Sequence, residues 1–354
     1  MNPLLIPVIA ITGLFFSALK LGAQTVESKL AALEKLPPQE RQQRLFDGAK
    51  SEGEALIYAN MDVSAMKPLT EGFMKRYPGT KAASVHFSGA AIITRIDSES
   101  RAGKAISDVV LSGQLGVLAL IDKKVAGRYR SPEREFYREG FKDKQGLWTA
   151  YMTNVMVSPY NTRQVKKDET PRAVEDLLQP RWKGKLTMDS QSYVWFGTMM
   201  QYLGEESGLR FMKRLNEQNI SHQRGRRLMT QLVAAGEFDM AVETNLNSVL
   251  TLSRQGAPLS FAPMQPYFLS PSLVFMSASA PRPYTAALFI DYLLSEEGQK
   301  VIVTTNRMPA HTKVKSPESQ LLEGQDVRIP DIFDIGKNYQ AIGNRYREIF
   351  GGAR

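Results

Sequence analysis

Short loops of small polar residues recur where a predicted strand ends and a predicted helix begins. They contain Asn60, Ser88-Gly89-Ala90 and Gly113-Gln114 in the first half of the chain, and Ser190–Tyr193, Arg224-Gly225 and Thr244-Asn245 in the second half. Free N–H groups at a helix start suit anions, because they converge on one point with the helix dipole behind them. Ordinary helix capping would explain any single loop. Six such loops in two similar halves favour a ligand cleft, with Ser192 and Tyr193 in its second half.

Three arginines, Arg224, Arg226 and Arg227, surround the start of a helix predicted over Arg226–Ala235. A guanidinium at a helix N-terminus opposes the helix dipole, so stability alone is a weak reason for it. Over a cleft, Arg224 could bind a carboxylate or phosphate with two parallel hydrogen bonds. The alternative is a solvated basic patch. We expect Arg224 in the site, and Gly89 and Gly225 would let a ligand approach the backbone closely.

Catalytic signatures are absent from the sequence. It contains no G-x-G-x-x-G after a strand, no P-loop, no H-E-x-x-H and no G-x-S-x-G. His86, His222 and His311 are far apart, so they form no local metal motif, and we expect His86 only as a polar residue of the cleft. Without cysteine, the chain forms no disulfide, thiolate metal site or Cys nucleophile. We therefore predict no catalytic residue, no metal site, no cofactor and no enzymatic activity.

Strands and helices alternate in both halves of the chain. Predicted strands include Ala55–Ala59, Ala82–Phe87 and Asp108–Leu111 in the first half, and Leu186–Met188 and Met240–Glu243 in the second. This alternation predicts an α/β fold in which each lobe has a mixed, mostly parallel sheet flanked by helices, and open sheets of this kind bind ligands at the carboxyl ends of their strands. A long apolar strand over Trp148–Pro159 would cross between two lobes. We expect lobe 1 over 24–150, lobe 2 over 151–265, and a return to lobe 1 with a C-terminal helical segment over 266–354.

Composition and the N-terminus bear on location and partners. The chain has 354 residues, 43% of them hydrophobic, and a net charge of +9, which favours acidic partners or merely a basic surface. The basic residues are scattered, which argues against nucleic acid as a partner. The apolar run Leu4–Leu19 followed by Gly22-Ala23 is typical of a secretory signal peptide over residues 1–23, with an uncleaved anchor as the alternative. We expect an exported, periplasmic monomer.

Several longer motifs resemble one family, the periplasmic (extracellular) solute-binding proteins of ABC importers. They occur in the same order as in that family over about residues 45–310: AKSEGEALIYAN (Ala49–Asn60), FMKRYPG (Phe73–Gly79), DLLQPRWKGKLTMD (Asp176–Asp189), AAGEFDMAV (Ala234–Val242) and APRPYTAALFIDYLLSEEGQKVI (Ala280–Ile302). The resemblance is to the branch that binds ferric iron, polyamines, thiamine, phosphonates or sugar phosphates. It implies the two-lobed type 2 fold, joined by crossing hinge strands, which closes around a solute and delivers it to an ABC permease.

The resemblance also bears on the solute. Ferric-iron members of this branch use adjacent tyrosines just after the strand that corresponds to Met240–Glu243, where this chain reads Thr244-Asn245-Leu246-Asn247. Tyr193 or Tyr267 could still line the cleft, but Asn245 suits an oxygen-rich organic ligand. We expect a small anionic solute. The alternatives are ferric iron or another metal ion, and a periplasmic sensor that docks a signalling partner.

Overall fold

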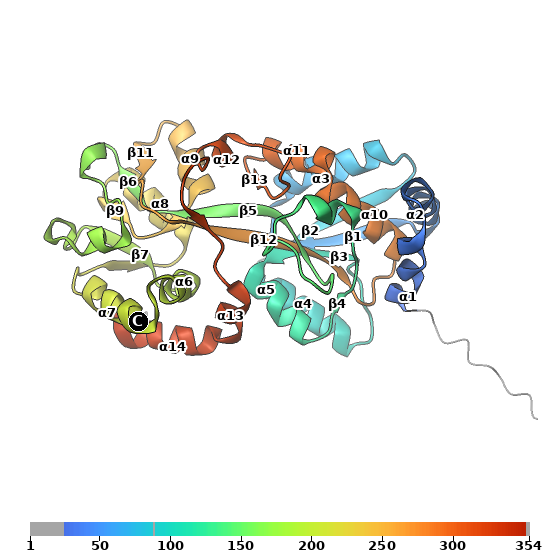
Figure 1. Cartoon of the computed structure of the whole chain (residues 1–354), viewed down its shortest axis with the longest axis horizontal. Helices are drawn as coiled ribbons and strands as arrows, with labels where there is room; N and C mark the ends of the chain where they lie inside the picture. The colour runs from blue at the N-terminus through green and yellow to red at the C-terminus, as the bar shows by residue number, and fades with distance from the viewer. Residues whose placement is uncertain (1–24, 88, 352–354) are drawn as a thin grey trace, which may run out of the picture.

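Each half of the chain forms its own sheet, and Figure 1 shows the two resulting lobes side by side along the long axis of the molecule. The structure is a computed structural model that describes residues 25–87 and 89–351. The signal peptide expected over residues 1–23, and Ser88 of the expected site, lie outside the described residues.

The first sheet has the strand order β10-β5-β12-β3-β1-β2, with three short strands at its margins. β1 pairs in parallel with β2 and β3, whereas β12 runs antiparallel to β3 and β5. Its strands are β1 (Glu54–Ala59), β2 (Lys81–His86), β3 (Val109–Gly113), β4 (Ala126–Gly127), β5 (Thr149–Val157), β10 (Thr244–Asn245), β12 (Tyr267–Ser277), β13 (Met308–Pro309) and β14 (Val327–Arg328).

The second sheet has the order β11-β6-β9-β7-β8. β7 is parallel to β8 and β9, and β6 is antiparallel to β9 and β11. Its strands are β6 (Pro159–Asn161), β7 (Leu186–Asp189), β8 (Ser221–Gln223), β9 (Met240–Ala241) and β11 (Leu259–Phe261). Both sheets are therefore mixed, and the predicted two-lobed α/β fold is confirmed.

Helices flank both sheets. Those of the first lobe are α1 (Val26–Ala31), α2 (Pro38–Glu52), α3 (Val63–Arg76), α4 (Gly89–Arg101), α5 (Gln114–Asp122), α10 (Pro283–Leu294) and α11 (Glu296–Thr304). Those of the second lobe are α6 (Tyr193–Leu203), α7 (Glu205–Asn216), α8 (Arg226–Ala235) and α9 (Leu246–Arg254). The C-terminal part adds α12 (Pro317–Gln320), α13 (Ile332–Lys337) and α14 (Tyr339–Phe350). Loops contain the short 3-10 helices η1 (Leu33–Lys35), η2 (Pro132–Phe136), η3 (Lys167–Glu169), η4 (Val174–Leu178) and η5 (Pro180–Trp182).

Two long antiparallel strands, β5 and β12, run between the lobes (Figure 1). The apolar run that predicts one strand over Trp148–Pro159 is two strands, because β5 ends at Val157 and β6 begins at Pro159 in the other sheet. The Ser158 hydroxyl donates to the Val242 carbonyl oxygen at 2.6 Å. This bond ties the crossing point to the second lobe. The expected boundaries at residues 150 and 265 stay a prediction.

The buried apolar side chains form two cores, of which the first extends from the first lobe to Met229 of α8 and Val249 of α9, and the second fills the rest of the second lobe. The first core includes fully buried Val109, Val110 and Leu111 of β3, which explains why this strand is a continuous apolar run. The second core includes the aromatic side chains of Trp182 and of Tyr346 in α14. The C-terminal helix α14 thus packs on the second lobe, against α6 and α7.

Candidate functional site

A cleft of about 820 Å³ lies where the two lobes meet the C-terminal helices. The first lobe lines it with residues from the ends of β1 and β3 and from α4 and α5, among them Asn60, Ile93, Ser112, Gln114 and Leu118. The second lobe contributes Val194 and Arg226, and strand β10 contributes Asn245. The C-terminal segment contributes Phe333, Gly336, Lys337 and Tyr339. The cleft therefore lies at the strand ends at which the sequence predicts ligand binding.

The structure brings three of the predicted site residues, Asn60, Gln114 and Asn245, together in the cleft lining. His86 lies at the end of β2 with an exposed side chain, and its Nδ1 is 2.9 Å from the Met61 carbonyl oxygen. It is not among the lining residues of this cleft. Gly89 and Ala90 form the first turn of α4, the helix that supplies Ile93 to the lining.

Ser192 and Tyr193 have positions behind the cleft wall. Ser192 is fully buried, and its hydroxyl donates to Oε1 of Glu243 at 2.6 Å. The Tyr193 ring packs edge-on against Tyr339, with 5.5 Å between ring centroids, and against Tyr346 at 5.2 Å. Tyr193 therefore supports Tyr339, which lines the cleft.

Arg226, rather than Arg224, is the arginine in the cleft lining. Arg224 precedes α8 and is exposed, while Gly225 caps the helix with a φ of 102° that favours glycine. The inward face of α8 carries the buried residues Met229 and Val233. Arg226 lies three and seven residues before them, so helical periodicity puts it on that same face.

A buried carboxylate holds the Arg226 side chain in place. The Nε of Arg226 donates to Oε1 and Oε2 of Glu243 at 3.1 and 2.9 Å, and Ser192 donates to the same carboxylate. The Glu243 side chain is 2% exposed and that of Arg226 is 32% exposed. The negative charge of Glu243 raises the pKa of Arg226 despite its burial, so the guanidinium stays charged. Among the described residues, its two Nη groups have no hydrogen-bond partner and are left for a ligand.

The cleft floor contains polar atoms that lack a protein partner. Within the described residues, Oδ1 of Asn60 and Oγ of Ser112 are buried without a hydrogen bond. Both residues line the cleft, at the ends of β1 and β3. A buried polar atom without a partner costs free energy unless a ligand or water satisfies it. The pair is therefore suited to a solute with hydrogen-bonding groups.

The described side chains of this cleft do not form a recognisable metal-binding site. The described part of the chain contains no group of three or more His, Cys, Asp or Glu that could hold a metal ion. Tyr339 lines the cleft, and burial raises the pKa of its phenol, which disfavours the tyrosinate form. Tyr193 lies behind Tyr339, and Tyr267 is buried on β12 with its ring edge-on to Phe261, 6.5 Å between centroids.

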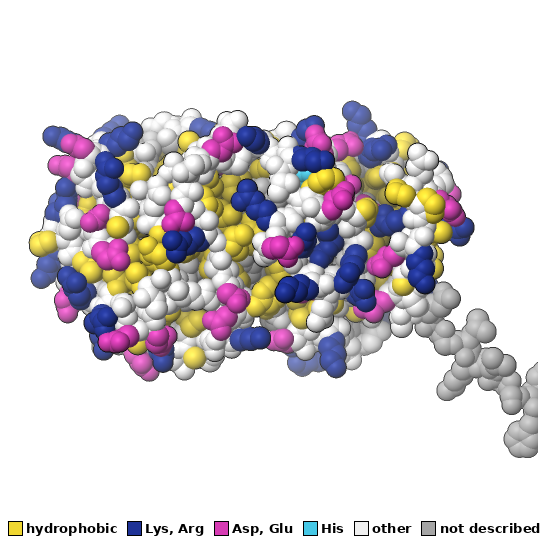
Figure 2. Space-filling model, viewed as in Figure 1, with side chains coloured by type: hydrophobic (Ala, Val, Ile, Leu, Met, Phe, Trp, Pro, Cys, Tyr) yellow, Lys and Arg dark blue, Asp and Glu magenta, His cyan; other side chains and the backbone are white. Residues whose placement is uncertain are grey.

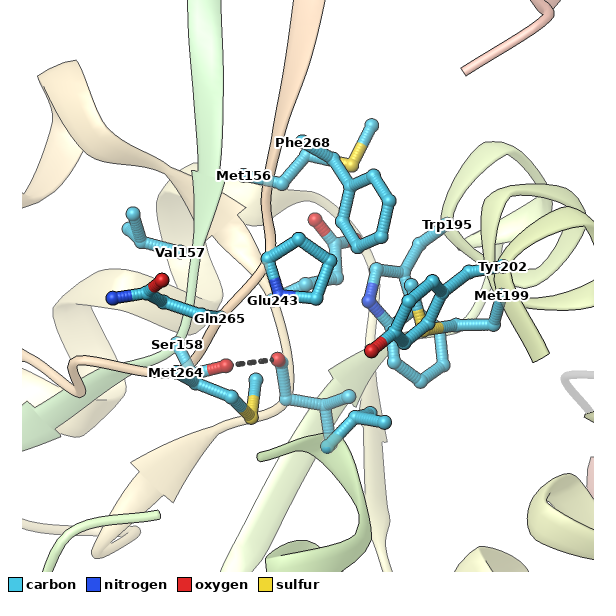
Figure 3. A pocket seen from close by; sticks show the side chains of 13 residues that line it. Met156, Val157, Ser158, Trp195, Met199, Tyr202, Glu243, Met264, Gln265 and Phe268 are labelled. Atoms are coloured by element: carbon cyan, nitrogen blue, oxygen red, sulfur yellow. Dashed lines mark hydrogen bonds between the residues drawn. The ribbon is translucent and has the colours of Figure 1, made fainter. Parts of the chain in front are cut away.

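A much smaller cavity, of about 30 Å³, lies in the second lobe next to the crossing strands. Figure 3 shows it between Phe268, Trp195 and Tyr202, with the hydrogen bond from Ser158 at one side. A space of this size holds at most two or three water molecules, since one water needs roughly 10–15 Å³. It is too small for a solute.

The surface charges of the molecule do not form one basic patch on the face seen in Figure 2. Lys and Arg side chains alternate there with Asp and Glu, and hydrophobic side chains are visible in the middle, between the lobes. No helix in the described ranges is long and apolar enough to cross a membrane. On this face the charges are mixed, in agreement with the scattering of the basic residues along the sequence.

Comparisons with known proteins agree with this geometry. The Fe(3+)-binding periplasmic protein of Serratia marcescens is 22% identical over 264 residues, which cover 71% of this chain and 76% of that protein. The apo ferric ion-binding protein A of Pasteurella haemolytica has a similar fold, with a TM-score of 0.73, 20% identity, and coverage of 85% of this chain and 99% of that one. The periplasmic binding protein AfuA of Actinobacillus pleuropneumoniae, with fructose-6-phosphate bound, has a TM-score of 0.70 at 22% identity, over 85% and 99%.

A sequence model of one protein family also matches this chain. The model of the bacterial extracellular solute-binding proteins matches residues 113–338, which is more than half of the chain. The matched range contains most of the cleft lining, from Gly113 to Lys337. This chain is a member of the bacterial extracellular solute-binding protein family.

Proposed function

We propose that this protein captures a small organic solute with a carboxylate or phosphate group and delivers it to an ABC importer in the inner membrane. The observation that carries this proposal is the Arg226 guanidinium, which Glu243 holds by one edge while its Nη groups stay free. A planar guanidinium fixed in this way is suited to two parallel hydrogen bonds with an anionic oxygen pair. Family membership makes the chain a binding protein rather than an enzyme.

The rest of the cleft supports the same solute class. Asn60, Ser112 and Asn245, at strand ends of the first sheet, offer hydrogen bonds without adding negative charge, and Arg226 reaches the cleft from the second lobe. Because the lobes are joined by β5 and β12, a solute that contacts both can favour a closed arrangement. The signal peptide expected over residues 1–23 supports a periplasmic location. Asp122 and Asp143 also line the cleft, so the anionic group is expected near Arg226.

Calorimetric titration tests this proposal. The purified protein is titrated with a panel of carboxylates, with phosphonates and sugar phosphates, and with ferric ion. We expect at least one organic anion to bind, and Arg226→Gln to weaken that binding. Tight binding of ferric ion alone would contradict the proposal.

Ferric iron is the second candidate, because the Serratia marcescens relative is named for binding Fe(3+). Hard oxygen anions are the ligands expected for such an ion, and the lining offers Asp122, Asp143 and Tyr339. These residues form no metal-binding group in the described structure. The organic anion therefore remains our first choice. A sensor role would differ in its gene neighbourhood, which would contain a histidine kinase in place of a permease and an ATPase.

A further inference from the structure

The C-terminal helix α13 occupies a position between the two lobes. Figure 1 shows it below the crossing strands β5 and β12, between the helices of one lobe and those of the other. It packs against α5 of the first lobe and α6 of the second, and α14 continues along α6 and α7. The cleft is therefore bounded by three units: two lobes and this C-terminal segment.

Close packing fixes α13 on both sides. A Cβ atom at Gly336 would lie 2.3 Å from Cδ1 of Leu118 in α5, so a larger residue there would require the Leu118 side chain to shift. On the other side, a Cβ at Gly197 of α6 would lie 3.0 Å from Cγ1 of Ile335. The Gln201 amide also pairs with the backbone of Asp331, with Nε2 donating to the carbonyl oxygen and Oε1 accepting from the N–H, both at 2.9 Å. The segment thus contacts both lobes.

Three side chains of the C-terminal segment, Phe333, Lys337 and Tyr339, face the cleft. The Phe333 ring stacks on Trp148, with 5.1 Å between centroids and 24° between planes, so its orientation is fixed. Within residues 25–87 and 89–351, the Lys337 ammonium has no ion pair and the Tyr339 hydroxyl has no hydrogen-bond partner. The segment therefore presents an aromatic face and two unused polar groups to whatever fills the cleft.

Apolar side chains of both lobes line the cleft next to this segment. Ile93, Leu118 and Leu147 line the cleft from the first lobe, and Val194 lines it from the second. Apolar walls gain free energy by covering an apolar ligand surface, whereas they offer nothing to hydroxyl groups or to a hydrated ion. The lining also contains polar side chains, among them Asn60, Gln114 and Arg226, which can fix the orientation of an organic ligand.

We infer that α13 and Tyr339 form a third wall that contacts the solute and selects one with an aromatic or apolar body next to its anionic group. In this arrangement Arg226 and Tyr339 receive the anionic group, and the body lies between Phe333 and the apolar side chains of α5. This inference rests on the proposed function, because it places the anionic group at Arg226. It adds that the C-terminal segment determines specificity.

A matched pair of probes tests the inference: phenylphosphonate and methylphosphonate carry the same anionic group and differ in their apolar body. We expect wild-type protein to bind phenylphosphonate at least about tenfold more tightly, since burying a ring contributes more than burying a methyl group. Phe333→Leu should weaken phenylphosphonate binding about three- to tenfold and leave methylphosphonate binding within about twofold. Phe136→Leu is the matched control, since Phe136 is also half-buried but lies in η2, outside the cleft lining.

The outcomes separate this inference from the proposed function. If both phosphonates bind equally, or if Phe333→Leu changes neither affinity, the third wall is refuted while an anion site at Arg226 can stand. If neither phosphonate binds and Arg226→Gln changes no affinity for any organic anion, both proposals fail. Should Phe333→Leu not fold, as judged from its circular dichroism, the comparison of the two probes on wild-type protein decides the matter.

Discussion

Replacing Arg226 by Gln should affect the stability of the protein as well as solute binding. The Glu243 carboxylate is 2% exposed and would lose its only cation among the described residues, keeping the hydrogen bond from Ser192. Breaking a fully buried ion pair costs about 3–5 kcal/mol of unfolding free energy. The guanidinium here is a third exposed, so we expect about 1–3 kcal/mol, or a fall in Tm of about 2–6 °C.

A second substitution, Glu243→Gln, separates the effect on stability from the effect on solute binding. In the double variant Arg226→Gln/Glu243→Gln the uncompensated charge is gone, so we expect the Tm to recover at least half of the decrease that Arg226→Gln causes. Solute affinity should remain low in both variants, because each lacks the guanidinium. The loss of one charge-assisted contact amounts to about 1.5–3 kcal/mol, or roughly a 10- to 150-fold weaker Kd.

Thermal unfolding followed by circular dichroism gives the stability, and calorimetry gives the affinity for the organic anion that binds wild-type protein most tightly. Arg224→Gln is the matched control, because Arg224 is exposed and lies outside the cleft lining. We expect this control to match the wild type in both measurements. Our reasoning would be refuted if Arg226→Gln kept full affinity, or if Arg224→Gln lost it instead.

Two further predictions concern pH and packing. Burial lowers the pKa of His222 and of His311, so the folded protein binds fewer protons at these groups than the unfolded chain. Their contribution to the unfolding free energy should therefore be fully present above the unfolded pKa of about 6.5 and should be lost as the pH falls below it. The Tm of the wild type should therefore decrease more between pH 7.5 and 5.5 than that of His222→Gln/His311→Asn; equal decreases would contradict this. Gly336→Ala should lower the Tm modestly, since its Cβ would meet Cδ1 of Leu118 at 2.3 Å and the Leu118 side chain must shift, at the low end of the overpacking range, about 1 kcal/mol. In the double variant Gly336→Ala/Leu118→Ala, the decrease in Tm should be smaller than the sum of the two single decreases. Strictly additive decreases in Tm would argue against the contact.

Much of the architecture can be read from the sequence, because each of its signals is local. Alternating apolar strands and amphipathic helices predict two α/β lobes, and the polar loops at strand ends predict where the cleft lies. Asn60, Gln114 and Asn245 were predicted in this way, and all three line the cleft, while their contact with a solute stays a prediction. Their type and their place at strand ends do not depend on which distant segments pack together.

Sequence reasoning did not identify Arg226 or its partner Glu243. Arg224 stood out because it precedes the helix, but the inward face of α8 is set by Met229 and Val233, a periodicity that identifies Arg226. Glu243 gave a usable signal as well: it ends the predicted apolar strand Met240–Glu243, and a buried carboxylate there requires a cation. Taken together, these two facts could have predicted the ion pair.

The contribution of the C-terminal segment could not be predicted. Residues Ile332–Lys337 form only a short helix, and their sequence does not show which surface they contact. The tight approach of Gly336 to Leu118 joins positions more than two hundred residues apart. Contacts of that kind depend on the tertiary arrangement of both lobes. For the same reason, long-range packing placed His86 outside the cleft lining although it ends a neighbouring strand.

Native mass spectrometry of the protein purified from periplasmic extract, before and after denaturation, tests the central claim most directly. We predict that wild-type protein carries a small organic anion in a one-to-one complex, that denaturation releases it for identification, and that Arg226→Gln protein purified in parallel lacks it. A bound mass equal to one iron atom without an organic anion, or the same organic anion in equal amount on Arg226→Gln, would contradict the account.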